Sequence, residues 1–178
     1  MPSVPTGFLL VASPELRDPN FARTVVLTIN HDAEGSYGLV LNRSLGRRLS
    51  DALPDVDERA AEIPLYQGGP VQPDVLQVLG SRPGCGRQIL EGVYLAESLD
   101  ALLEGAPHAQ GLHGYVGYSG WGAEQLEHET AEGSWVIAPA RADHVFGIPT
   151  DQLWATVLRE LGGQYRWIPM QDEDPGVN

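Results

Sequence analysis

Short runs of apolar, largely β-branched residues are separated along this chain by clusters of turn-forming residues. Three such runs open the sequence, at residues 7–13, 24–30 and 37–43. Because they are short and almost continuously apolar, we expect them to form central strands that are buried on both faces. Residues 31–36 read His-Asp-Ala-Glu-Gly-Ser, a turn composition that favours an antiparallel hairpin between the second and third runs.

Further apolar runs predict strands in the rest of the chain, and glycine or proline residues separate them. Gly68-Gly69-Pro70 ends the first of them, and we expect a backbone with positive φ or close packing there. Residues 119–122, Ser-Gly-Trp-Gly, follow a later run, and we expect them to form a tight turn that leads into a helix. The predicted strands are residues 65–67, 75–79, 88–95, 113–118 and 134–138.

Capping residues and one apolar stripe predict the helices. Ser98 is placed to cap a helix that ends at residue 105, and a glutamate-rich helix is expected over residues 124–133. Residues 50–53 predict a short helix that stops at a proline. Asp151 is the expected N-cap of the last helix. The apolar stripe of that helix consists of Leu153, Trp154, Val157, Leu158 and Leu161.

Strands interspersed with short helices predict a mixed α/β fold, with a central mixed β-sheet and flanking helices. A length of 178 residues suits one domain, which we place at residues 1–170. Residues 46–96 could form a small lobe inserted into the main sheet. We expect residues 171–178 to form a loose acidic tail, because they are polar and follow the last apolar element.

The charge balance disfavours several partners. Twenty-four carboxylates face eleven basic residues, all of them arginine, which gives a net charge of −13. Nucleic-acid phosphates and the anionic cytoplasmic leaflet of a membrane both require clustered cations. A single cysteine, Cys85, cannot form an internal disulfide, and no apolar run reaches the length of a membrane span. We therefore expect a cytoplasmic protein that binds neither membranes nor nucleic acid directly.

Seven motifs, spread from about Gly7 to Gly162, together resemble the YqgE/AlgH family of small bacterial proteins. The resemblance implies a mixed-sheet α/β fold with a smaller lobe and, through one member, a role in regulating transcription for exopolysaccharide synthesis. It implies no activity and no cofactor. The chain departs from the family at Ser119, where alanine is usual. The motifs are Gly7-Phe-Leu-Leu-Val-Ala-Ser-Pro14, Asp18-Pro-Asn-Phe-Ala-Arg-Thr-Val-Val26, Gly38-Leu-Val-Leu-Asn-Arg43, Gly68-Gly-Pro-Val71, Gly117-Tyr-Ser-Gly-Trp-Gly122, Gln125-Leu-Glu127 and Gly133-Ser-Trp135.

Candidate catalytic and metal-binding motifs are incomplete. Gly117-Tyr-Ser119-Gly-Trp121 approaches a nucleophile elbow, but that turn needs a second glycine where this chain has tryptophan. His128 and Glu132 share one helical face without the second histidine of a zinc protease. Cys85 is a lone loop cysteine between arginines. We therefore expect no catalytic residue, no metal and no cofactor.

Polar residues in the loops at strand ends are the strongest candidates for a binding surface, because ligands gather at such loops in α/β sheets. A structural role competes with this interpretation. Ser13 and Asp18 each precede a proline and could start a helical turn, Arg23 could pair with Asp18, and Asn42 could hold a loop. The candidate binding surface consists of Ser13, Asp18, Asn20, Phe21, Arg23, Asn42, Arg43, Trp121, Gln125 and Glu127.

Two functions remain open at this point. The favoured one is a non-catalytic binding or regulatory protein that contacts a protein partner or a small ligand. The alternative is a hydrolase-like enzyme in which Asp18, Asn20, Arg23 and Glu127 converge in one polar cleft. Arg43, Arg47 and Arg48 form the basic island of the sequence, and three arginines are a small basis for DNA affinity in so acidic a protein.

Overall fold

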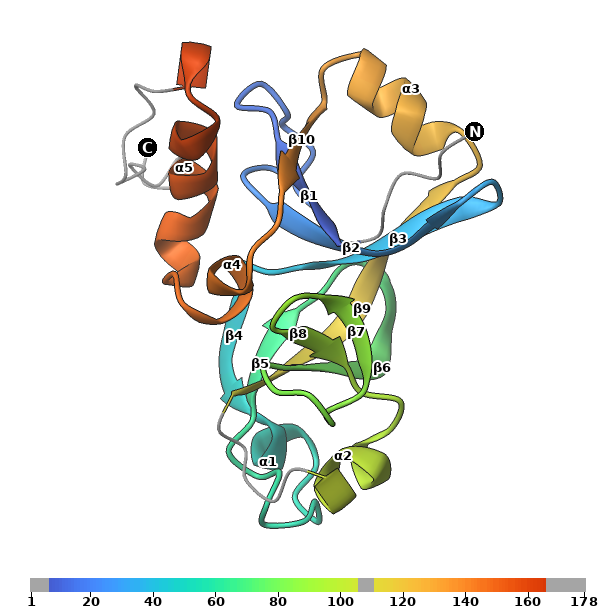
Figure 1. The fold of residues 1–178 in the computed structure, drawn as a ribbon, viewed down its shortest axis with the longest axis vertical. Coiled ribbons are helices and arrows are strands. Elements are labelled where there is room, and N and C mark those ends of the chain that lie inside the picture. Colours follow the sequence, from blue (N-terminus) through green and yellow to red (C-terminus); the bar gives the residue numbers. More distant parts are fainter. Residues whose placement is uncertain (1–6, 106–110, 166–178) are drawn as a thin grey trace.

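Ten strands form a curled, mixed β-sheet in the computed structural model, which describes residues 7–105 and 111–165 (Figure 1). The strand order is β10-β1-β2-β3-β9-β6-β8-β7, with β4 and β5 attached beside β9. Neighbouring strands are antiparallel except β5 and β9, which are parallel, so the predicted mixed sheet is confirmed. The strands are β1 (Phe8–Ala12), β2 (Val25–Asp32), β3 (Gly35–Val40), β4 (Ser44–Arg48), β5 (Pro64–Gln67), β6 (Val71–Gly80), β7 (Arg87–Leu90), β8 (Val93–Leu95), β9 (Leu112–Gly122) and β10 (Trp135–Pro139).

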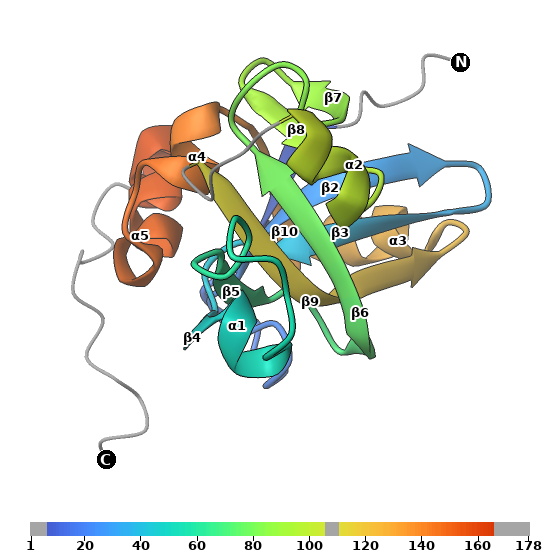
Figure 2. The same ribbon diagram turned by 90° about the horizontal axis from the view of Figure 1, so that it is seen from below.

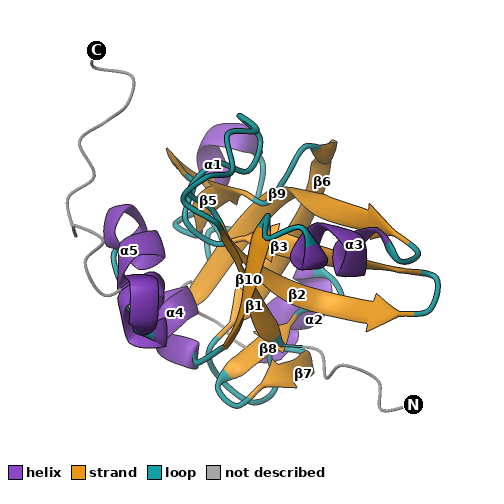
Figure 3. Ribbon diagram, turned by 90° about the horizontal axis from the view of Figure 1, so that it is seen from above, coloured by secondary structure: helices purple, strands orange, loops and turns teal. Residues whose placement is uncertain are grey.

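The helices lie outside the sheet. Figure 3 shows α4 and α5 on one side of β1, β2 and β10, with α3 on the other side. Helices α1 and α2 lie at the far end of the molecule, beside β4 to β8 (Figure 1). The helices are α1 (Leu49–Ala52), α2 (Leu99–Gly105), α3 (Gln125–Ala131), α4 (Ala142–Phe146) and α5 (Thr150–Leu161), followed by a 3-10 turn at Gly163–Tyr165. None of the helices described is long and apolar enough to span a lipid bilayer.

Strand β9 connects the two ends of the molecule (Figures 1 and 2). Its first part pairs with β5 and β6, and its last four residues pair with residues 35–38 of β3. The prediction of a turn at residues 119–122 is therefore wrong. Gly117, with φ of 74°, supplies the backbone bend two residues earlier, and β9 then continues. Gly69 lies so close to this bend that a Cβ atom there would stand 2.2 Å from the Tyr118 main chain, so the expected close packing is present.

Three apolar clusters hold the elements together. The largest contains β1 to β3 with α5, a second lies under α3, and a third joins α1, α2, β5 and β6. Strand β1, Phe8–Ala12, which lies inside the first predicted run, is buried at every position, as expected for a central strand. In α5, Leu153, Trp154, Val157 and Leu158 are buried on one stripe, and the Trp154 indole N–H donates to the Ala12 carbonyl oxygen at 2.8 Å.

Some predicted boundaries are wrong. Residues 88–95 form two strands, because the chain turns at Gly92. Asp151 lies inside α5, whose N-cap is Pro149. Strand β4 and helix α4 were not predicted. The inserted lobe at 46–96 stays a prediction, and the tail 171–178 lies outside the described residues.

Candidate functional site

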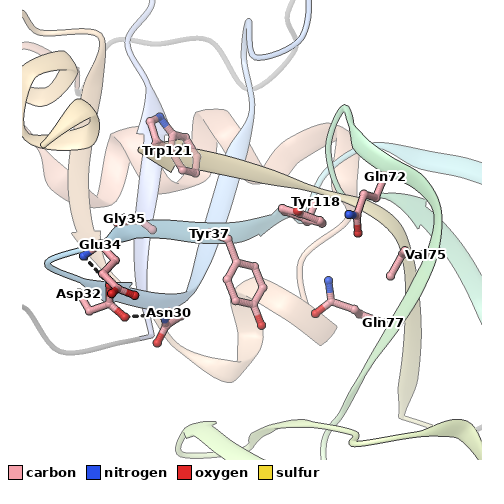
Figure 4. Close-up of a pocket in the computed structure, with 11 residues that line it drawn as sticks. Asn30, Asp32, Glu34, Gly35, Tyr37, Gln72, Val75, Gln77, Tyr118 and Trp121 are labelled. Carbon is pink, nitrogen blue, oxygen red and sulfur yellow. Dashed lines mark hydrogen bonds between the residues drawn. The ribbon is translucent and has the colours of Figure 1, made fainter. Parts of the chain in front are cut away.

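An open hollow of about 540 Å³ lies between the β2–β3 hairpin and strand β6 (Figure 4). Tyr37 and Tyr118 come from the paired strands β3 and β9, while Gln72, Val75 and Gln77 stand across from them on β6. The hollow is lined by Asn30, Asp32, Glu34, Gly35, Ser36, Tyr37, Gln72, Val75, Gln77, Tyr118 and Trp121.

The acidic end of the hollow is fixed by the hairpin tip. A register shift between Thr28 and Asn30 displaces the end of β2 relative to β3. Asp32 Oδ1 accepts the Glu34 main-chain N–H at 2.8 Å, and Asp32 Oδ2 accepts the Asn30 side-chain amide at 3.1 Å. These hydrogen bonds lower the pKa of Asp32, so its carboxylate is charged at neutral pH.

Two tyrosines form the middle of the hollow. The Tyr37 and Tyr118 rings meet edge to face, with centroids 5.7 Å apart. Burial raises the pKa of Tyr37, while the nearby Arg87 guanidinium lowers it and Tyr118 raises it further. Because the net shift is upward, Tyr37 is a neutral phenol that can both donate and accept a hydrogen bond.

The third side of the hollow is lined by Gln72, Val75 and Gln77 of β6, a strand whose outer edge is incompletely paired. Strand β6 pairs with β9 along one side, but with β8 only at Leu79 and Gly80. The Val78 carbonyl accepts the Ala96 N–H at 2.9 Å, so the two-residue period of a strand directs the Leu76 main-chain groups toward the same outer edge. Among the described strands, none pairs with this outer edge of β6 at Leu76.

The loop at residues 13–23 and the end of β3 form a separate polar cluster. Asp18 Oδ1 accepts the Asn20 N–H at 2.8 Å, which caps the turn as the structural interpretation expects. The Arg43 guanidinium donates to the Asn20 carbonyl at 2.7 Å and the Pro19 carbonyl at 3.0 Å. Burial lowers the pKa of Arg43, and the Asp18 carboxylate opposes that shift. These side chains are therefore occupied in holding the loop.

Ser13 and Asn42 also have structural partners. Ser13 Oγ accepts the Glu15 N–H at 3.3 Å. Asn42 Nδ2 donates to the Arg23 carbonyl at 2.8 Å, and its Oδ1 accepts the Val25 N–H at 2.9 Å, so Asn42 holds the loop as expected. The Arg23 guanidinium lies over the Trp154 ring, 5.7 Å from its centroid.

The remaining predicted residues gather under helix α3. The Phe21 ring lies 5.9 Å from Trp121, between centroids, and both belong to the small apolar cluster there. Glu129 Oε1 accepts the indole N–H groups of Trp121 and Trp135, at 3.2 and 3.0 Å, and Glu129 Oε2 accepts the Gln125 amide at 2.8 Å. Of the ten predicted residues, Trp121 alone lines the hollow of Figure 4.

Glu127 takes part in a serine–histidine–carboxylate array. His31 Nε2 lies 3.4 Å from Glu127 Oε1, and His31 Nδ1 is hydrogen-bonded to Ser36 Oγ across the hairpin. Ser36 is only 8% exposed. The array thus ties α3 to the β2–β3 hairpin.

Ser119, the serine of the incomplete nucleophile-elbow motif, is not among the residues that line the hollow. Ser119 is fully buried in β9, and its hydroxyl donates to the Gly68 carbonyl at 3.2 Å. Across residues 7–105 and 111–165, no group of three or more histidine, cysteine, aspartate or glutamate side chains is arranged to hold a metal ion.

Sequence reasoning missed most of the hollow. Asp32 and Glu34 were interpreted as part of a polar hairpin tip and Asn30 as the end of the second strand, and Gln72 and Gln77 received no role. The acidic pair Asp32 and Glu34 beside an amide was the available signal, but the approach of β6 toward the hairpin comes from the pairing of both with β9.

Comparison with known proteins agrees with this fold. A family model described as AlgH-like matches residues 9–166. The chain belongs to the AlgH-like family. A UPF0301 protein of Chlorobaculum tepidum is 37% identical over 97% of this chain and 95% of its own length. A UPF0301 protein of Chlamydia caviae is 41% identical over 97% and 94%.

Two solved structures are similar in fold to this chain. The solution structure of the AlgH protein from Pseudomonas aeruginosa has a TM-score of 0.74 and 31% identity, covering 98% of this chain and 99% of that protein. A crystal structure of a protein from Corynebacterium diphtheriae has a TM-score of 0.76, covering 93% and 90%. At 24% identity, that second likeness concerns the fold alone.

Proposed function

We propose that the chain is a non-catalytic binding protein that holds a basic segment of a partner protein in the hollow of Figure 4. The observation that carries this proposal is the composition of the lining. Asp32 and Glu34 supply negative charge, Tyr37 and Tyr118 supply aromatic faces, and none of the described residues that line the hollow is lysine, arginine or histidine. A guanidinium or ammonium group is attracted by both carboxylates and ring faces.

The β6 edge supports an extended conformation for the bound segment. A partner strand could add its main-chain hydrogen bonds at Leu76 while its side chains reach the hollow. Pro73 has no N–H, so strand addition is confined to the residues after it. Gln72 and Gln77 then offer amide groups to the side chains or main chain of the segment.

The positions of the polar loop residues support binding over hydrolysis. The hydrolase alternative requires Asp18, Asn20, Arg23 and Glu127 to converge. Instead, Asp18 caps a turn, Arg23 stacks on an indole ring and Glu127 pairs with a histidine on the hairpin. Asp18 and Asn20 belong to one turn, whereas Arg23 contacts helix α5 and Glu127 contacts the β2–β3 hairpin.

The same reasoning supports a regulatory role through protein contacts rather than DNA contacts. Two of the three arginines in the basic island already have acceptors, since Arg43 holds the 18–23 turn and Arg48 pairs with Glu62 at 2.9 Å. A net charge of −13 repels phosphates at longer range. We place this regulatory function in the cytoplasm.

A panel of capped tripeptides tests the proposed site. Acetyl-Ala-Arg-Ala-amide and its lysine, glutamine and glutamate counterparts are titrated into ¹⁵N-labelled protein. We expect amide shifts at Asp32, Tyr37 and Gln77 with the two basic peptides and not with the acidic one. Asp32→Asn with Glu34→Gln should weaken binding about tenfold, since each screened ion pair contributes up to about 1 kcal/mol. Glu15→Gln is the matched control and should change nothing.

A serine-reactive probe tests the hydrolase alternative. We expect no covalent adduct on the intact protein, by mass spectrometry, after incubation with a fluorophosphonate. If Ser36 formed an adduct and the protein hydrolysed 4-nitrophenyl acetate, and if Ser36→Ala abolished both, the hydrolase alternative would be favoured over the binding proposal. Shifts that fall outside the hollow in the peptide titration would also contradict it.

A further inference from the structure

A second, larger hollow lies at the opposite end of the molecule from helix α3. Its volume is about 730 Å³, and its lining comes from helix α2 and from residues 53–59, the segment that follows α1. Leu53, Val56, Leu99 and Leu103 line it, and Leu53 is 48% exposed. Val56, Leu99 and Leu103 belong to the apolar cluster beneath, so the floor of this groove is continuous with the core.

The rim of the groove is acidic. Among the described residues, Asp55, Asp57, Asp100 and Glu104 line it, together with one guanidinium, that of Arg59. Arg59 is already occupied, because it forms an ion pair with Asp57 at 2.8 Å and donates to the Leu103 carbonyl at 3.2 Å. The groove therefore combines an apolar floor with a net negative rim.

We propose that this groove docks a basic amphipathic helix of a partner protein. Such a helix would place two leucine-type side chains on the floor and lysine or arginine side chains beside Asp55, Asp100 and Glu104. A helix is favoured over an extended segment because the described lining residues belong to α2 and to turns, and none of them lies in a strand. Recognition must then come from side chains.

Charge separates this occupant from two others. A second copy of the chain would bring another surface of a −13 protein to an acidic rim. The chain's own residues 171–178 contain Asp172, Glu173 and Asp174 and no basic residue, so their sign is also wrong. A cationic partner satisfies the rim and the floor at once.

The test uses the full chain and a synthetic 14-residue peptide, capped at both ends, with leucine at a helical i, i+3, i+4, i+7 spacing and lysine elsewhere. Two control peptides carry glutamate in place of lysine, or the same residues in an order that breaks the leucine stripe. We expect saturable binding of the first peptide, with ¹⁵N shifts at Val56, Leu99 and Leu103. Binding of the glutamate or scrambled peptide with equal affinity would overturn the proposal.

Matched variants assign the binding to the groove. Leu53→Gln should weaken binding at least fivefold, and Asp100→Asn with Glu104→Gln should weaken it and flatten its salt dependence. Asp74→Asn, an exposed carboxylate on β6, and the Asp32→Asn, Glu34→Gln pair should leave binding unchanged. If the Asp32→Asn, Glu34→Gln variant lost peptide binding, the peptide would be bound in the hollow of Figure 4. That result would contradict this inference and would still agree with the proposed function. If the protein bound no peptide and formed a dimer that the Leu53→Gln substitution dissociated, the groove would instead bind a second copy of the chain.

Discussion

The side-chain amide of Asn42 holds the main chain of Arg23 in the left-handed region of backbone space. Asn42 Nδ2 donates to the Arg23 carbonyl at 2.8 Å, and Arg23 has φ of 59°. This conformation is strained for a residue with a side chain. The conformation of Arg23, the last residue of the 18–23 turn, thus depends on a side chain nineteen positions later in the chain.

Loss of that amide should destabilise the protein. We expect Asn42→Ala to lower the free energy of unfolding by about 1–3 kcal/mol, because it leaves the buried Val25 N–H without its acceptor. Arg23→Gly is the comparison variant. It relieves the positive φ but loses the contact with Trp154, so its net effect should stay within about 1 kcal/mol. Urea unfolding of both variants decides this, and an equal loss in the two would contradict the assignment to Asn42.

Glu129 should be a major stabiliser of the region under α3. Glu129→Ala leaves two indole N–H groups, on Trp121 and Trp135, without their acceptor, so we expect a loss of about 2–5 kcal/mol. Glu129→Gln keeps an acceptor oxygen and should cost less than half as much. Thermal unfolding followed by tryptophan fluorescence measures both, and indistinguishable variants would show that the shared acceptor does not matter.

His113 should make stability depend on pH. Burial lowers its pKa to about 4, and the ring packs between Tyr66 and Phe146, with centroids 4.8 and 5.0 Å away. An unfolded histidine has a pKa near 6.5, so the unfolded state binds more protons between pH 6.5 and 4. Stability from this residue is therefore present above about pH 6.5 and is lost as the pH falls toward 4.

The size of this loss is up to about 3 kcal/mol, at 1.36 kcal/mol for each pH unit between the two pKa values. Urea unfolding at pH 7, 5.5 and 4.5 should show a smaller decline in His113→Phe than in the parent protein. Parallel declines in the two proteins would mean that other groups control the acid sensitivity.

The Ser119→Ala variant tests whether Ser119 has only a structural role or takes part directly in function. The hydroxyl is buried and donates to the Gly68 carbonyl, so its removal should cost about 1 kcal/mol. Binding of the basic tripeptides should be unchanged. A folded Ser119→Ala protein that no longer binds them would give this residue a direct role that its burial argues against.

The parts of the fold that the sequence predicts are those whose burial is decided locally. The run Phe8–Ala12 is apolar throughout, and the stripe of α5 repeats at helical spacing, so both can be predicted without knowledge of their partners. Strand β4 was missed because all five of its residues are exposed and only one of them, Leu45, is a large apolar residue. Its strand conformation comes from pairing with β5.

The hollow was missed for a related reason. Tyr37 and Gln77 are forty positions apart, and they face one space because β3 and β6 pair with opposite edges of β9. The predicted surface residues were instead those in motif-rich loops, where Asp18, Asn42 and Arg43 turned out to bind main-chain groups. A polar residue in a loop has the same signature in the sequence whether it holds the backbone or a ligand.

The shared strand β9 has a consequence for attempts to divide the molecule. Residues 46–96 carry β5 and β6, yet the strand between those two comes from residues 112–122. Expressed alone, that fragment would lack β9, the strand that pairs with both β5 and β6, and it should stay unfolded. Deleting it would in turn leave the first part of β9 without a partner strand on either edge. The two ends of the molecule should therefore unfold together in a single cooperative step.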